Sequence, residues 1–211
     1  MQLRFLLCFF GLLFGLGTRL QAQVGNLGCQ TDDYNQRLRQ ANPALASQTE
    51  AFEALIYQKT MERLSKAKNA SAPTPMADPV YTVPVVVHIV HNNGAENISD
   101  AEVQTAIERM NLVFANAGVY YHPNAVDVGI QFCLAVQDPN GNATTGINRI
   151  VNAQYTDLDY PSENAGLKAL SFWPSTDYMN IWLVKSISNG VYAFSSLAGS
   201  AGSASDGVVC L

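Results

Sequence analysis

The stretch VPVVVHIVH, Val83 to His91, decides the fold class of this chain. Most of its residues are β-branched and it is followed by the turn residues NNG, so it predicts a buried strand. The next segment, ISDAEVQTAIERMNLVFANAG at 98–118, predicts a helix. Its Ser99 and Glu102 have the spacing of a capping box, and apolar residues then recur at helical intervals. A strand followed at once by an amphipathic helix indicates an α/β domain.

The same stretch holds two of the three histidines, which raises the question of a metal site. Side chains alternate between the faces of a strand, so His88 and His91, three positions apart, point to opposite faces. They cannot share one ion unless the strand is bulged. His122 precedes a proline in a loop and has no ligand partner nearby in sequence. The histidines are therefore predicted to be packed or partly exposed imidazoles.

The rest of the chain continues the α/β pattern with short apolar strands separated by turn residues. The expected strands are at 128–136, 147–151, 179–184, 191–197 and 207–211, with one helical turn within 163–174. The last strand is apolar and ends the sequence. Apolar strands are normally covered by further structure, so we expect the chain to be part of a longer protein.

Composition and the N-terminus bear on location and partners. The 211 residues carry a net charge of −5 and have no cluster of Lys or Arg, which argues against a nucleic-acid partner. Arg4, a thirteen-residue apolar run and Ala22 have the layout of a secretory signal peptide at 1–22. The run is shorter than the about 20 residues that span a bilayer. We expect a secreted or extracytoplasmic protein that has no membrane association after signal cleavage.

Two segments separate the signal from the α/β domain. Residues 23–68 contain an amphipathic helix, expected at 44–68, that has too few apolar residues for a core. Residues 69–80 include NASAPTPMADP, a linker by composition and a natural site for a protease. The packed domain is expected at 81–211.

The ordered set VPVVVHIVH, ISDAEVQTAIERMNLVFAN, IQFCLAVQDPNGNATTGINRI, LKALSFWPSTDYMNIWLV and DGVV resembles the N-terminal half of a pappalysin/cytophagalysin-type metallopeptidase of the metzincin clan. The resemblance implies a mixed, twisted sheet with a long packing helix. The sheet and this helix would form only the upper subdomain of the catalytic domain, and a helical pro-segment would precede them. The resemblance also implies a secreted zinc-dependent endopeptidase precursor acting on protein or peptide substrates. The alternative is a non-catalytic secreted binding module.

In that family the zinc ligands and the general base come from the motif H-E-x-x-H-x-x-G-x-x-H. This sequence contains no His-Glu pair. The resemblance therefore implies zinc ligands downstream of residue 211, and a 211-residue chain that is inactive alone.

The segment GCQTDDYNQRLRQANP resembles the pro-segment of bacterial family members. Cys29 matches the cysteine thought to hold the zinc in the inactive precursor, although Gln30 stands where those relatives have glycine. A thiolate is a good zinc ligand and a fourth ligand blocks catalysis. The alternative for Cys29 is a spare thiol or half of a disulfide.

The segment Asp206, Gly207, Val208 and Val209 matches, in the family, the edge strand that lies beside the substrate. Edge strands bind extended peptides by main-chain pairing. The alternative, an internal strand with no substrate role, is equally compatible with the sequence.

Two further groups are candidates from the sequence alone. Asp157, Asp159 and Glu163 form an acidic stretch that could hold calcium, but it lacks the EF-hand spacing and fits a solvated loop better. Cys133 and Cys210 both fall on expected strands. They could form a disulfide, or each could pair with a cysteine elsewhere, because geometry decides and sequence does not.

Overall fold

The computed structural model describes residues 28–69 and 80–211. The predicted signal peptide at 1–22 and nearly all of the predicted linker lie outside these ranges. A seven-stranded sheet with the order β1-β8-β9-β6-β2-β3 forms the centre, and β4 also pairs with β2. The strands are β1 (Gly28–Cys29), β2 (Tyr81–His91), β3 (Ile130–Leu134), β4 (Ile147–Val151), β6 (Met179–Leu183), β8 (Val191–Ser195) and β9 (Val208–Cys210).

The predicted strand at Val83–His91 is the middle of this sheet. β2 pairs in parallel with β6 on one side. On its other side it pairs in parallel with β3 along its first half and with β4 along its second half. Residues Val85 to His91 are all buried, which explains the continuous apolar run, because a central parallel strand is covered on both faces.

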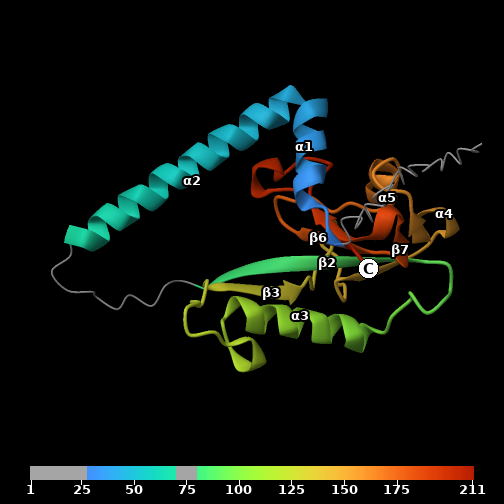
Figure 1. Ribbon diagram of the computed structural model, residues 1–211. Helices are drawn as coiled ribbons and strands as arrows, with labels where there is room; N and C mark the ends of the chain where they lie inside the picture. The colour runs from blue at the N-terminus through green and yellow to red at the C-terminus, as the bar shows by residue number, and fades with distance from the viewer. Residues whose placement is uncertain (1–27, 70–79) are drawn as a thin grey trace, which may run out of the picture.

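One face of the sheet is covered by α3 (Asp100–Phe114), which lies below the sheet in Figure 1. The capping box is confirmed, since Ser99 Oγ accepts from Glu102 N and the Glu102 carboxylate accepts from Ser99 N. The apolar core on this face consists of Val85, Val87, Ile89, Val103, Ile107 and Phe132. Burial of the apolar stripe of α3 therefore fixes the helix against β2 and β3.

The opposite face carries α1 (Thr31–Ala41), α4 (Ala153–Thr156) and α5 (Asn164–Leu170), which lie above the sheet in Figure 1. Their core is built around Trp182, Phe194 and Leu167, none of which has exposed surface. A small two-stranded sheet of β5 (Asp157–Leu158) and β7 (Ser186–Ile187) flanks this side. Short 3-10 turns, η1 (Gly118–Tyr120), η2 (Ser188–Gly190) and η3 (Ala198–Ser200), complete the described elements.

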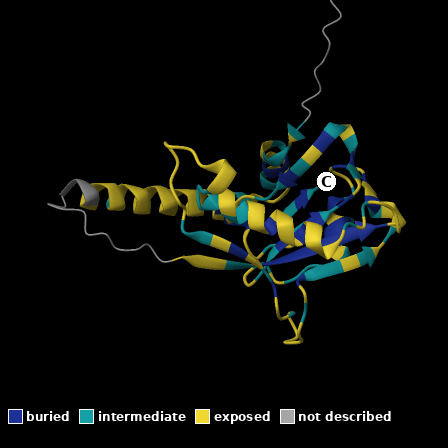
Figure 2. Ribbon diagram, turned by 90° about the horizontal axis from the view of Figure 1, so that it is seen from below, coloured by how far each residue is buried: buried dark blue, intermediate teal, exposed yellow. Residues whose placement is uncertain are grey.

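The long helix α2 (Pro43–Asn69) matches the helix expected at 44–68. Only its first turns are packed, with Leu45 and Thr49 buried near η3. Beyond them α2 extends away from the body (Figure 1), and nearly all of it is exposed in Figure 2. Its exposed large apolar side chains are Phe52, Leu55, Ile56, Tyr57, Met61 and Leu64. Across the residues that were described, none of the helices has the length and apolarity to cross a membrane.

The sheet is thus mixed, with parallel strands throughout the centre and an antiparallel pairing of β8 with β9 near one edge. A mixed sheet covered by a long helix on one face confirms the predicted α/β class.

Candidate functional site

The N-terminal segment, residues 28–69, contacts the sheet edge formed by β8 through β1 and the start of α1. β1 pairs in parallel with β8, with Cys29 in register with Ala193. Beyond β1, the Gln30 amide donates to the Ala193 carbonyl at 2.9 Å. β8 therefore has β9 on its inner side and the N-terminal segment on its outer side. Without that segment, β8 would expose one row of main-chain donors and acceptors.

Of the two alternatives for Asp206–Val209, the substrate-side edge strand is wrong and the internal strand is confirmed. Val208 pairs with Ile181 of β6 on one side and with Ser195 of β8 on the other. Val209 is fully buried and Asp206 and Gly207 form the turn into β9, where the Asp206 carboxylate accepts from Ser196 Oγ. The segment is internal because β8, which precedes it in sequence, folds back outside it. Within residues 80–211, the outermost strand on this side of the sheet is β8, Val191–Ser195.

Cys29 lies on the α3 side of the sheet. It is in register with Ala193, Ala193 with Cys210, and Cys210 with Leu183, and residues in register share a face. Leu183 packs against the α3-side core. The Cys29 thiol is exposed and lies 3.1 Å from Thr31 Oγ1. On this side β6 and β9 are only half-buried, since α3 covers β2 and β3.

Of the alternatives that the sequence left open for Cys133 and Cys210, a disulfide between the two is contradicted. Both thiols are free. Their strands, β3 and β9, are separated by β2 and β6, so the three inter-strand steps alone separate the Cα atoms by about 14 Å, against about 7 Å at most for a disulfide. The two side chains also point to opposite faces of the sheet. Cys210 shares the α3 side with Leu183, whereas Cys133 is in register with Pro84, on the other face.

A polar cluster that the sequence did not reveal joins the N-terminal segment to the body. The Tyr34 hydroxyl donates to the Ser205 carbonyl at 2.9 Å and accepts from Asn164 Nδ2 at 3.0 Å and Lys168 Nζ at 3.3 Å. Lys168 Nζ also donates to the Ser205 carbonyl at 2.6 Å. Tyr34 and its partners lie 130 or more positions apart in sequence, so no local pattern could have indicated them.

Burial sets the electrostatics of this cluster. It lowers the pKa of Lys168 to about 7, an effect that the charge of Asp206 partly offsets. It raises the pKa of Tyr34 to about 12, so the phenol keeps its proton. The ammonium nitrogen of Lys168 lies 5.2 Å from the centre of the Tyr34 ring and 5.3 Å from that of Trp182. Aromatic faces stabilise a cation, which compensates for part of the lost hydration.

The neighbouring Asn35 contacts the end of β8. Its Nδ2 donates to the Ser195 carbonyl at 2.9 Å, and its Oδ1 accepts from the Leu197 amide at 2.9 Å. Asn35 is buried, and Nδ2 also donates to Thr31 O. A side-chain amide here has the donor and acceptor that a main-chain peptide group would present to β8.

The histidines lie as the alternation of the strand predicts. His88 is buried on the Trp182 side, with Nε2 3.0 Å from Asn180 Oδ1 and Nδ1 3.3 Å from Asn148 Nδ2. Burial lowers its pKa to about 4. His91 is on the alternate face of β2, and His122 Nδ1 accepts from the Asn124 amide in an exposed loop.

The described residues do not fit a zinc site. Within residues 28–69 and 80–211, no three side chains of His, Cys, Asp or Glu lie close enough to hold a metal ion. The carboxylates of the acidic stretch, the candidate calcium site, do not converge on one point. Asp157 contacts Lys185 and Ser186, Asp159 accepts from Ser162 and Ser188, and Glu163 accepts from Gln154. Each carboxylate has its own partners, so the three do not converge.

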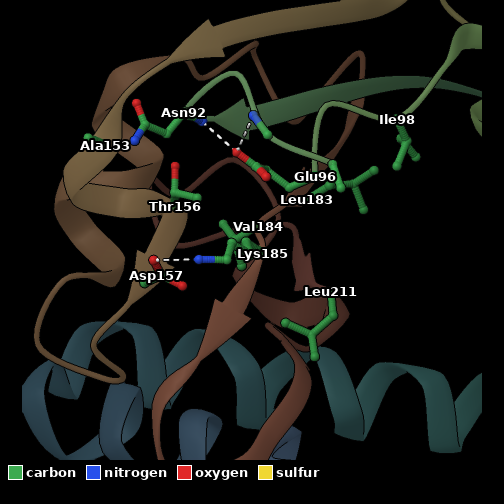
Figure 3. Close-up of a pocket in the computed structure, with 12 residues that line it drawn as sticks. Asn92, Glu96, Ile98, Ala153, Thr156, Asp157, Leu183, Val184, Lys185 and Leu211 are labelled. Atoms are coloured by element: carbon green, nitrogen blue, oxygen red, sulfur yellow. Dashed lines mark hydrogen bonds and ion pairs between the residues drawn. The ribbon is translucent and has the colours of Figure 1, made fainter.

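A pocket of about 690 Å³ opens at the carboxyl ends of β2 and β6 (Figure 3). Glu96 Oε1 accepts there from the Asn92 amide at 2.7 Å and the Gly94 amide at 3.1 Å. Lys185 and Asp157 form an ion pair at 3.2 Å on the opposite wall. The charged groups of this pocket are paired with each other or with main chain, so they do not assemble a catalytic group.

Comparison with known proteins gives structural relatives only. No family model matches the chain, and no curated protein matches it. Mature mirolysin from Tannerella forsythia, in complex with a cleaved peptide, superposes with a TM-score of 0.52 and 31% identity, over 63% of this chain and 53% of that one. Promirolysin mutant E225A from the same organism superposes with a TM-score of 0.54 and 27% identity, over 87% of this chain and 59% of that one.

A further structure, mirolysin in complex with compound 9, has a TM-score of 0.50 and 31% identity, over 63% of this chain and 53% of that one. The chain thus spans between half and three fifths of the length of these proteins. It has a metallopeptidase-like fold, of the type seen in mirolysin and its precursor. The pappalysin type in particular is not distinguished by these matches.

Proposed function

We propose that this chain is the N-terminal portion of the precursor of a secreted zinc-dependent endopeptidase of the pappalysin type. Residues 1–22 would be the signal peptide, 23–68 the pro-segment, 69–80 the linker and 81–211 the first part of the catalytic domain. The observation that carries the proposal is the placement of Cys29 and β1 along the outer edge of β8, in a sheet of the mirolysin type.

The two neighbours differ in a way that supports a pro-segment. The precursor matches 87% of this chain, whereas the mature protein matches 63%. A larger match to the precursor is expected if the residues ahead of 81 correspond to a segment that maturation removes. The pro-segment would then be the part that holds β1 and α1.

The substrate platform of the mature enzyme is proposed to be β8. When β1 leaves, the outer edge of β8 offers unpaired main-chain groups to an extended peptide, and such edges recognise peptides by strand addition. Mature mirolysin is solved with a cleaved peptide bound. The likeness to that protein supports a protein or peptide substrate here, and the net charge of −5 disfavours nucleic acid.

Cys29 is proposed as the inhibitory zinc ligand of the precursor. Its thiol is exposed on the α3 side of the sheet, beside strands that α3 leaves half-buried. This is a face on which a further helix can pack. The zinc ligands themselves would come from residues outside this sequence, because none of the 211 residues belongs to an H-E-x-x-H motif. We therefore assign no catalytic step to the described residues.

The coding sequence beyond codon 211 gives the first test. We expect an H-E-x-x-H-x-x-G-x-x-H motif there, and its absence would favour a non-catalytic secreted binding module. The second test uses the protein expressed from that full coding sequence. It should bind one zinc ion and cleave a fluorogenic peptide after proteolysis in the linker. The Cys29→Ser precursor should cleave it before proteolysis, and equal latency of the two precursors would refute the inhibitory role of Cys29.

A further inference from the structure

The pro-segment contacts the body unequally along its length. Cys29, the proposed zinc ligand, is exposed, and β1 is only two residues long with an irregular register. Five and six positions later, Tyr34 keeps 3% of its surface exposed and Asn35 keeps 7%. Side chains that are removed from solvent to this extent contribute far more to association than exposed ones. The main attachment of the pro-segment to the body is therefore at Tyr34 and Asn35, and not at the strand that carries Cys29.

Tyr34 has the contacts of an anchoring residue. Its ring packs on Phe194 of β8 at 5.0 Å between centroids. Its hydroxyl uses its one donor on Ser205 O and accepts two hydrogen bonds, from Asn164 and Lys168. A phenol offers one donor and two acceptor sites, so its hydrogen-bonding capacity is filled. Loss of the hydroxyl would leave the buried Asn164 and Lys168 with fewer partners, which costs more than a lost exposed contact.

Asn35 prolongs the strand pairing beyond β1. Its amide bonds to Ser195 O and Leu197 N, both at 2.9 Å, at the point where β8 ends. Gln30 N makes the preceding contact, to Ala193 O. The pro-segment thus continues along the β8 edge through a side chain, although its main chain has already turned into α1.

We propose that Tyr34 and Asn35 form a metal-independent anchor that keeps β1 on β8, so that Cys29 is held in place whether or not its thiol binds zinc. The inference rests on the proposed function, since it concerns how the pro-segment of that enzyme is retained. Cys29 would then contribute only the contact with the metal, whereas Tyr34 and Asn35 would bind the pro-segment to the rest of the protein.

Amide hydrogen exchange of the full chain in EDTA at a fixed pH of 7.5 tests this. The readout is exchange in peptides covering residues 28–41, with α3 as the internal reference for folding. We expect Tyr34→Ala to accelerate exchange in this segment by about tenfold or more, and Tyr34→Phe, which retains the ring, by a smaller factor of a few-fold. Asn35→Asp, of nearly the same size but without the Nδ2 donor, should accelerate it by about tenfold.

Two controls define the specificity of the effect. Cys29→Ser should leave exchange within about twofold of the wild type, because no metal is present. Tyr57→Ala, at an exposed tyrosine of α2, should leave it unchanged. If Tyr34→Ala also accelerates exchange in α3, this variant has lost part of its fold. The test then depends on exchange of residues 28–41 in the Tyr34→Phe and Asn35→Asp variants.

The anchor is refuted if Cys29→Ser opens the segment as much as the anchor variants do, or if Tyr34→Phe and Asn35→Asp both retain wild-type protection. The experiment needs neither zinc nor peptidase activity. Slow exchange in residues 28–41 that depends on Tyr34 and Asn35 can therefore be found in a protein without peptidase activity. It can also be missing from an active peptidase, so each proposal can be refuted without the other.

Discussion

Nε2 of His88 lies 3.0 Å from Oδ1 of Asn180, in the interior of the sheet where both side chains are fully buried. Because Oδ1 also accepts from the Trp173 amide at 2.9 Å, the histidine nitrogen is the donor in this pair. Nδ1 then accepts from Asn148 Nδ2, and the imidazole stacks on Trp182 at 5.1 Å. The geometry suits a neutral imidazole.

The first prediction follows from this arrangement. Burial lowers the pKa of His88 from 6.5 to about 4, so the unfolded chain takes up a proton before the folded chain does. Stability should therefore fall as pH drops from 6.5 to 4, by up to about 3 kcal/mol from this residue. Urea unfolding at pH 7 and pH 4.5 measures the effect. His88→Gln should reduce the pH dependence, whereas the exposed His122→Gln should retain it; equal pH dependence of all three proteins would contradict the prediction.

Lys168 should give a pH dependence in the alkaline range. Its pKa is lowered to about 7 in the folded state, so between pH 7 and 10.5 the unfolded chain holds one more proton. Stability from this residue should rise with pH in that window, by about 2–3 kcal/mol between pH 7 and 9. Lys168→Met should remove the rise, and Lys185→Met, at an exposed lysine, should retain it. Denaturant unfolding at pH 7, 8 and 9 measures this, and a rise that persists in Lys168→Met would exclude Lys168 as its source.

Gly207 should not tolerate a side chain. A Cβ there would lie 2.7 Å from the Asn180 carbonyl oxygen and 2.6 Å from the Trp182 ring, at a backbone φ of +106°. We expect Gly207→Ala to cost about 3 kcal/mol or more, by strain and by displacement of the core. Gly141→Ala is the matched control. Its φ is +86°, but the nearest atom is the flexible end of Gln137 at 3.6 Å, so it should cost about 1 kcal/mol. Thermal unfolding measures both losses of stability. Similar losses for Gly207→Ala and Gly141→Ala would contradict the prediction, because the core would then have relieved the contacts of the new Cβ at position 207.

The cysteines should differ in reactivity. Cys29 and Cys133 are exposed, whereas burial raises the pKa of Cys210 to about 11. Since the thiolate is the reactive form, brief treatment of the native protein with iodoacetamide at pH 8 should label the first two and spare Cys210. Peptide mapping by mass spectrometry measures this. A tryptic peptide pair linked through Cys133 and Cys210 after mild oxidation would contradict the separation of their strands.

The sequence predicted best those features that depend on near neighbours. The alternation of Val83–His91 placed His88 and His91 on opposite faces, and the Ser99–Glu102 spacing located the start of α3. Both depend on residues within one strand or one turn of helix. The long α2 was likewise predicted to within one residue at each end.

The features that were wrong or missed depend on pairings between distant segments. The sequences VYAFS and VVC do not indicate which of these two strands lies outside the other. An edge position and an internal one were therefore both open for Asp206–Val209, and the edge is occupied by β8 and β1. The partners of Tyr34 are equally remote. Lys168 lies in a segment expected to form a single helical turn, and nothing near it in sequence marks it as buried beside a tyrosine.

The parallel addition of β1 has a consequence for the biogenesis of the protein. An uncapped strand at the margin of a sheet is a template for other chains, and it invites aggregation before folding is complete. With the main chain of residues 28–30 and the carboxamide of Asn35, the N-terminal segment covers that edge from Val191 to Ser195. We therefore expect this pairing, which requires no metal, to keep the edge of β8 from joining other chains while the sheet forms.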